Sequence, residues 1–204
     1  CQLCQAVKKK SNTRQGTLDF APIPHDIFDS LCMDFLQLPP CTDKYGTIYD
    51  YALVIVCRLS GFTLAIPCKK DGLTAEDVAH LFLQRIVAIF GIPHEIMSDC
   101  DHLINSKFMN TVCETAGILQ HTSIIYRPQG NGRAETAVRL VLEVLRKALL
   151  ETTTTWYNAL PWALWQLNDL PGVDQHHSPH YIVFGRQAIG LGDIPSYKTS
   201  RQSV

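Results

Sequence analysis

The sequence predicts an α/β fold in which a mixed β-sheet is covered by helices. Three segments with strand character come first, and helical and strand segments alternate after them. This order is typical of a mixed sheet with helices on its faces. The chain has 204 residues, of which 46% are hydrophobic and 18% are charged, so it is long enough to bury a core around one domain.

The first strand is the most informative of the three, because a carboxylate interrupts it. Strands are predicted at residues 27–38, 50–58 and 62–68. In the first, alternation places Asp34 on the same face as Cys32 and Leu36. The Pro39-Pro40 pair is expected to end this strand, since proline cannot donate to a β-ladder.

The later elements are predicted from helical spacing and from capping residues. Helices are expected at about residues 74–91, 106–117, 134–150, 155–169 and 178–185, with strands at 94–98 and 118–126. Thr74 and Ser106 are the predicted N-caps of the first two helices, and Gly91 and Gly117 their stops. The helix at 134–150 has the clearest pattern, with one apolar stripe and one charged face.

Three acids stand where catalytic groups are often found. Asp34 lies in an otherwise apolar strand, where a carboxylate is costly unless it is paired or binds a metal ion. Asp99 ends a strand, and Glu135 opens a helix after a glycine-containing loop. Asp101 is a rival of Asp99, but Asp99 is preferred because it directly follows the apolar strand.

The spacing and surroundings of these acids resemble those of retroviral and gypsy-type long-terminal-repeat retrotransposon integrases. Between Asp34 and Asp99 lie 64 residues, and between Asp99 and Glu135 lie 35. The local sequences Met-Asp-Phe at 33–35, Ile-Met-Ser-Asp at 96–99 and Tyr-Arg-Pro-Gln-Gly-Asn-Gly-Arg-Ala-Glu at 126–135 resemble the family's motifs. Segments at 156–161 and 178–186 resemble those that follow the core in gypsy-type elements.

The resemblance implies a ribonuclease H-like fold with a five-stranded mixed sheet, and a nuclear polynucleotidyl transferase with endonuclease activity. Its expected reactions are 3′-end processing of retroelement DNA and strand transfer into target DNA. The family's cofactor is Mg²⁺ or Mn²⁺, as two ions that flank an in-line displacement. The resemblance gives Asp34 as the ligand that bridges both ions, with Asp99 and Glu135 each holding one.

The expected partner is DNA, both the element ends and the target. The formal net charge is −1, so affinity for phosphate must come from local basic surface. Residues 127–147 contain five basic side chains against two acids. The candidate DNA-binding residues are Gln129, Asn131, Arg133, Arg139 and Lys147, with Arg139 first because it lies one helical turn after Glu135.

A homo-oligomer is also expected, with the apolar segment 156–167 as a candidate interface. No membrane partner is expected, because no stretch approaches the roughly 18 apolar residues of a membrane span.

Three departures from the family pattern leave alternatives open. Arg127 replaces the usual His, Thr136 follows Glu135 where Arg is common, and Cys100-Asp101 replaces a basic residue and Gly. An active integrase is the leading hypothesis. The alternatives are a domesticated, catalytically silent derivative that binds DNA or protein, and a nuclease of the same fold.

The chain divides into a linker at 1–20 with a remnant of an N-terminal zinc module, an integrase core with trailing helices at 21–185, and a polar tail at 186–204. Cys1 and Cys4 resemble half of the family's His-His-Cys-Cys zinc site. A structural zinc site needs four ligands, so zinc is not expected in this fragment. The eight cysteines are irregularly spaced and are expected to be mostly buried thiols.

Overall fold

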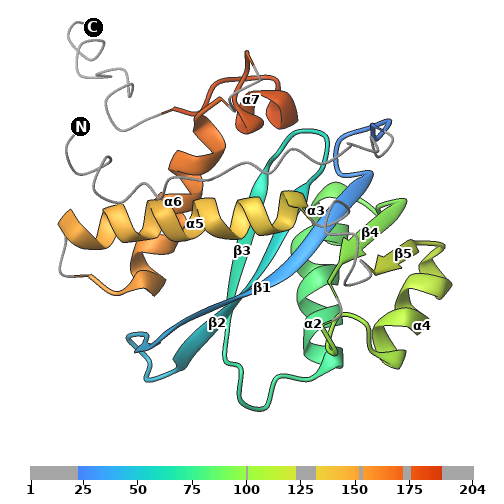
Figure 1. Ribbon diagram of the computed structural model, residues 1–204, viewed down its shortest axis with the longest axis horizontal. Helices are drawn as coiled ribbons and strands as arrows, with labels where there is room; N and C mark the ends of the chain where they lie inside the picture. Colours follow the sequence, from blue (N-terminus) through green and yellow to red (C-terminus); the bar gives the residue numbers. More distant parts are fainter. Residues whose placement is uncertain (1–22, 100, 123–131, 152–153, 172–175, 190–204) are drawn as a thin grey trace, which may run out of the picture.

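One five-stranded sheet organises the chain (Figure 1). The computed structural model describes residues 23–99, 101–122, 132–151, 154–171 and 176–189. The strands are β1 Ser30–Thr42, β2 Ile48–Cys57, β3 Thr63–Cys68, β4 Glu95–Ser98 and β5 Leu119–Thr122, in the order β3-β2-β1-β4-β5. The first three pair antiparallel, and β4 and β5 continue parallel to β1, so the predicted mixed sheet is confirmed.

Helices cover both faces of this sheet. One side is covered by α2 Ala75–Phe82, η1 Leu83–Val87, α3 Ala88–Phe90 and α4 Lys107–Ala116 (Figure 1). The other side is covered by α5 Gly132–Glu151 and α6 Trp156–Asp169, and α7 Pro179–Phe184 packs against α6. The side chains of β1 alternate between the two layers: Leu31 and Met33 join the core under α2 and α4, and Cys32 and Leu36 the core under α5 and α6.

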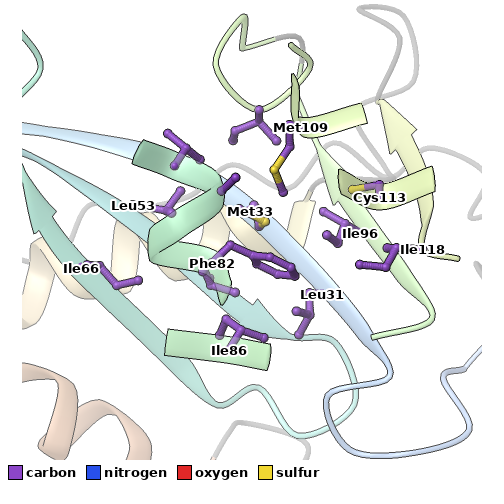
Figure 2. Packing of buried hydrophobic residues seen from close by; sticks show 14 of the residues in the cluster. Leu31, Met33, Leu53, Ile66, Phe82, Ile86, Ile96, Met109, Cys113 and Ile118 are labelled. Atoms are coloured by element: carbon purple, nitrogen blue, oxygen red, sulfur yellow. The ribbon is translucent and has the colours of Figure 1, made fainter. Parts of the chain in front are cut away.

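The core under α2 is tightly filled. Figure 2 shows the Phe82 ring between the strands and η1, beside Leu31 and Ile86, and all three side chains are fully buried. Burial of such side chains is the main force holding helices to a sheet. Helices are therefore packed against both faces of the sheet.

The sequence predicted that the Pro39-Pro40 pair would end the first strand, and this prediction is wrong. β1 continues to Thr42, and its pairing with β2 shifts register between Gln37 and Cys41. The prolines are tolerated here because, among the described residues, β4 pairs with residues 30–33 of β1 and no strand pairs with residues 39–40 on that side. Trp156 at the start of α6 donates a hydrogen bond from its indole Nε1 to the Pro39 carbonyl oxygen at 2.7 Å.

The predicted caps and stops of the first two helices are confirmed. Thr74 and Asp77 form a capping box, and Ser106 accepts from the backbone N–H of Met109. Gly91 and Gly117 follow the helices with positive φ. The sequence did not predict the π-helical turn at η1, which interrupts the first helix.

Some expectations fall outside the described residues. The strand predicted at 118–126 is present from Leu119 to Thr122, and the rest of that range is not described. The linker at 1–20 and nearly all of the tail at 186–204 also lie outside the described residues.

None of the described helices combines the length and the apolarity that crossing a membrane requires. Of the five cysteines described as free thiols, four are buried and Cys41 is partly buried.

A polar network lies at the amino-terminal end of β1 and β4. Arg58 Nη1 contacts Glu95 Oε1 at 2.5 Å and donates to Ser30 Oγ at 2.9 Å. Ser30 Oγ also donates to the Glu95 carboxylate, and His121 Nε2 approaches Glu95 Oε2 at 3.5 Å. The Arg58 side chain is 8% exposed and that of Glu95 is 18% exposed, so this ion pair is largely removed from water.

Candidate active site

Two of the predicted acids follow paired residues of the neighbouring strands β1 and β4. The last residue pair between the parallel strands β1 and β4 is Met33 with Ser98. Asp34 and Asp99 follow these residues on neighbouring strands. Asp34 alternates with Met33 and so points to the α5 face, as Cys32 does. The structure thus brings Asp34, which lies within β1, beside the carboxyl-terminal end of β4, where Asp99 follows and where open sheets usually bind ligands.

Glu135 comes within electrostatic range of Asp34 from the helix layer. It lies in the first turn of α5, is exposed to solvent, and belongs to the helix that packs across β1 and β2. Its negative charge contributes to raising the pKa of Asp34, so the two carboxylates are within electrostatic range of each other. Residues far apart in the sequence therefore place negative charge around one point.

The pKa of Asp34 shows how unfavourable this arrangement is without a cation. Together, all causes raise the pKa from the ordinary 3.8 to about 6, and burial is the largest of them. The charges of Asp99, Glu135 and Asp101 also raise it, while the backbone N–H of Phe35, which donates to Asp34 Oδ1 at 2.7 Å, lowers it. Half-buried and surrounded by like charges, Asp34 is suited to binding a positive ion.

We expect the stability of the metal-free protein to depend on this carboxyl group. A raised folded pKa favours the protonated form in the folded state, so the stabilisation is complete below about pH 4 and is lost as the pH rises to about 6. Relative to wild type, Asp34→Asn should therefore become more stable by on the order of 2 kcal/mol between pH 4 and pH 7.

Denaturant unfolding in EDTA across this pH range measures the difference. Asp71→Asn is a matched control, because the Asp71 side chain is 90% exposed and pairs only with Lys69 among the described contacts. A difference between Asp34→Asn and wild type that stays constant with pH would contradict the assignment of the raised pKa.

Asp101, the rival of Asp99, has a local role in the loop after β4. Its Oδ1 accepts from the backbone N–H of Leu103 at 2.8 Å, and its own N–H donates to Asp99 Oδ1 at 3.0 Å. Because its charge also raises the pKa of Asp34, Asp101 adds a fourth carboxylate to the same neighbourhood.

Sequence reasoning missed Tyr51 as a neighbour of these acids. Burial and then the charges of Asp101, Cys68, Asp34 and Asp99 raise the pKa of the Tyr51 phenol. Its ring stacks on that of Phe35 with centroids 4.9 Å apart, and Lys70 Nζ lies 5.3 Å from its centroid. A tyrosine within an apolar strand carries no distinctive signal in the sequence, so only the paired strands reveal this contact.

The donor set fits a hard divalent cation by its chemistry. Asp34, Asp99 and Glu135 offer only carboxylate oxygens, the ligands that Mg²⁺ and Mn²⁺ prefer, and no thiol or imidazole is among them. A cation would also offset the mutual repulsion that contributes to the raised pKa of Asp34. Within the described ranges, however, no three His, Cys, Asp or Glu side chains are already arranged to hold a metal ion.

The predicted DNA-binding residues fall into three groups. Gln129 and Asn131 lie outside the described residues, and Arg133 belongs to the first turn of α5. Arg139 is exposed one turn after Glu135, whereas Lys147 is partly buried. Arg146, which was not among the candidates, is exposed two turns beyond Arg139 and continues the same line along the helix.

Sequence comparison finds relatives among retrotransposons. The chain is 32% identical over 206 aligned residues to the transposon Tf2-3 polyprotein of Schizosaccharomyces pombe, and equally so to the Tf2-4 polyprotein. These alignments cover 100% of the chain but only 15% of each polyprotein, so the chain spans a small part of these relatives. No protein-family model matches the chain.

Structure comparison finds retroviral integrases. The catalytic core domain of BIV integrase is 27% identical with a TM-score of 0.58, covering 76% of this chain and 93% of that domain. The HTLV-2 integrase catalytic core in complex with magnesium has the same TM-score at 23% identity, covering 78% and 97%. A simian T-cell lymphotropic virus intasome chain matches with a TM-score of 0.65 at 22% identity, covering 100% and 69%.

Proposed function

We propose that this chain is the catalytic core of a retroelement integrase. It is homologous to the Tf2 retrotransposon polyproteins, and it has the ribonuclease H-like fold of retroviral integrase catalytic cores. Its proposed reactions are the trimming of element DNA ends and the transfer of the new 3′-hydroxyls to target DNA. The observation that supports this proposal is that Asp34 and Asp99 directly follow the paired residues Met33 and Ser98, with the charge of Glu135 also acting on Asp34.

The proposed roles follow from where each residue lies. Asp34 and Asp99 would hold divalent ions from neighbouring strands, and Glu135 would close the ligand set from α5. Divalent ions at such a site stabilise the charge on the attacking and the leaving oxygen of a phosphodiester exchange. Asp34 would be held by its paired strand β1, whereas Asp99, in the loop after β4, and Glu135, on α5, would depend on the positions of that loop and that helix.

The proposed partner is DNA, and the proposed location is the nucleus. Arg139, with Gln129, Asn131, Arg133 and Lys147, would contact phosphates beside the acids. We also propose a homo-oligomer. Within the candidate interface at 156–167, Trp156 is buried, whereas Trp162 and Trp165 are 58% and 37% exposed and would be available for contact with a second copy.

A strand-joining assay tests the proposed function. The substrate is labelled DNA with the ends of the element, incubated with the protein and with Mg²⁺, Mn²⁺ or EDTA. Metal-dependent joined products support the proposal. Cleaved but never joined DNA would instead indicate a nuclease, and DNA binding without either product would indicate a catalytically silent derivative.

Arg139→Ala should weaken DNA binding without changing its sequence preference. Loss of one phosphate contact lowers the slope of log affinity against log salt by about 1. Fluorescence anisotropy with a short duplex at several salt concentrations measures this slope. Arg85→Ala is the matched control, because Arg85 is an exposed arginine in η1, on the opposite layer. Equal slopes for Arg139→Ala and wild type would remove Arg139 from the proposed DNA surface.

A further inference from the structure

One amide side chain organises the loop that carries Asp99. Asn105 Nδ2 donates to the carbonyl oxygen of Asp99 at 2.5 Å and to that of Asp101 at 3.2 Å. Its Oδ1 accepts from Thr122 Oγ1 at 2.6 Å and from Gln120 Nε2 at 3.4 Å. Both ends of the amide are thus engaged, with its donors toward the loop and its acceptor toward β5.

These contacts tie the loop to the sheet. Thr122 is the last described residue of β5 and pairs with Ser98, the residue before Asp99. Gln120 Nε2 also donates to the carbonyl oxygen of Ile104 at 2.9 Å, and the backbone N–H of Asn105 donates to the Asp101 carbonyl oxygen at 2.9 Å. The chain after Asp99 is therefore fastened to the neighbouring strand as well as to its own turn.

The same contacts determine where the Asp99 carboxylate can point. Its Oδ1 accepts from the backbone N–H of Asp101, and the carbonyl groups of Asp99 and Asp101 both converge on Asn105. Removing the amide would leave these two part-buried carbonyl oxygens without this donor, which is unfavourable. We therefore expect the loop backbone to rearrange without Asn105 and the Asp99 side chain to change its orientation.

We propose that Asn105 is a positioning residue that holds Asp99 in its metal-binding orientation through the loop backbone. This role rests on the proposed function, because it presumes that Asp99 binds a divalent ion. Asn105 acts through Asp99 and does not itself touch the ion or DNA. Residues that orient ligands in this way typically account for about 10- to 100-fold in metal affinity.

The experiment compares Asn105→Ala and Thr122→Val with wild type by two measurements on the whole 204-residue chain. The first is amide hydrogen exchange at Asp101 in metal-free protein, which reports the bond to Asp99 Oδ1. The second is Mn²⁺ affinity from electron paramagnetic resonance of the free ion. Asn110→Ala is the matched control, since Asn110 is an exposed asparagine on α4.

For Asn105→Ala we expect faster exchange at Asp101 and a Mn²⁺ affinity lower by about 10- to 100-fold. Thr122→Val, which removes one of the two bonds to Asn105 Oδ1, should change both in the same direction by less. If Asn105→Ala does not fold, the exposed Thr122 position decides the question by the same measurements.

The two possible failures are distinguishable. Wild-type Mn²⁺ binding that Asn105→Ala and Thr122→Val leave unchanged overturns the role of Asn105 and spares the proposed function. Absence of Mn²⁺ binding by the wild type overturns the metal site and the role of Asn105 together.

Discussion

Asp34→Asn should reduce strand joining by about 1000-fold, because a metal ion contributes several kcal/mol to the transition state and each 1.36 kcal/mol is a factor of ten in rate. Asp34 lies centrally among the acids, and its pKa responds to the charges of Asp99, Glu135 and Asp101. Replacing it with the neutral isostere removes a ligand while preserving shape. A quantitative time course of joined product in Mg²⁺ measures the effect.

The fold should survive this change. Near pH 7 the substitution removes a half-buried charge, so the metal-free variant should be at least as stable as the wild type. A loss of joining together with unchanged or increased stability is a pattern typical of a functional residue. Loss of joining through unfolding would instead lower the melting temperature, which circular dichroism detects.

Glu135→Gln should have a comparable effect, and Glu143→Gln provides its matched control. Both glutamates lie on α5, but Glu143 is two turns further along the helix.

The variants Asp99→Asn and Asp101→Asn test which of the two rival carboxylates is the second metal ligand. If Asp101→Asn abolished joining and Asp99→Asn did not, the assignment of the second ligand would have to be reversed.

The sequence was sufficient to predict the elements whose signals are local. Thr74, Ser106 and the two glycines that follow their helices mark boundaries through short-range capping, and each boundary is confirmed. The alternation around Asp34 correctly separated the two faces of β1, because side chains of a strand alternate whatever the strand pairs with.

The failures came from long-range contacts. The end of β1 was misplaced because the cost of proline in a strand depends on whether a neighbour needs its N–H, and that is a property of the sheet order. For the same reason, the sequence did not predict that Tyr51 and Asn105 contact or neighbour the candidate site. Each becomes part of the site only through strand pairing or through a loop that folds back onto β5.

The candidate site was predicted in part. Parallel pairing brings Asp34, inside β1, and Asp99, directly after β4, next to each other, because they follow the paired residues Met33 and Ser98. The role of each acid came from resemblance alone, and neither spacing nor sheet register determines which carboxylate would bridge two ions. Gln129 and Asn131 stay predictions, since they lie outside the described residues.

Glu95→Gln should lower the free energy of unfolding by about 3 kcal/mol, because it removes one charge of a largely buried ion pair with Arg58. Denaturant unfolding measures this loss. His121→Ala is the matched control, since the His121 side chain is 54% exposed and contacts Glu95 only at 3.5 Å. Exposed pairs of this kind contribute at most about 1 kcal/mol.

The double variant Arg58→Met with Glu95→Leu separates the value of the pair from the cost of breaking it. Replacing both charges with apolar side chains of similar size is often close to neutral, so the double variant should be more stable than Glu95→Gln. If both proteins were equally destabilised, the loss would come from packing and not from an uncompensated charge.

The ion pair is also separated from the candidate site. Ser30, which contacts both partners of the pair, precedes Asp34 on β1 by about 13 Å of extended strand. At temperatures where the variants stay folded, strand joining should therefore be retained, and the stabilising ion pair and the candidate metal ligands act as separate parts of one sheet.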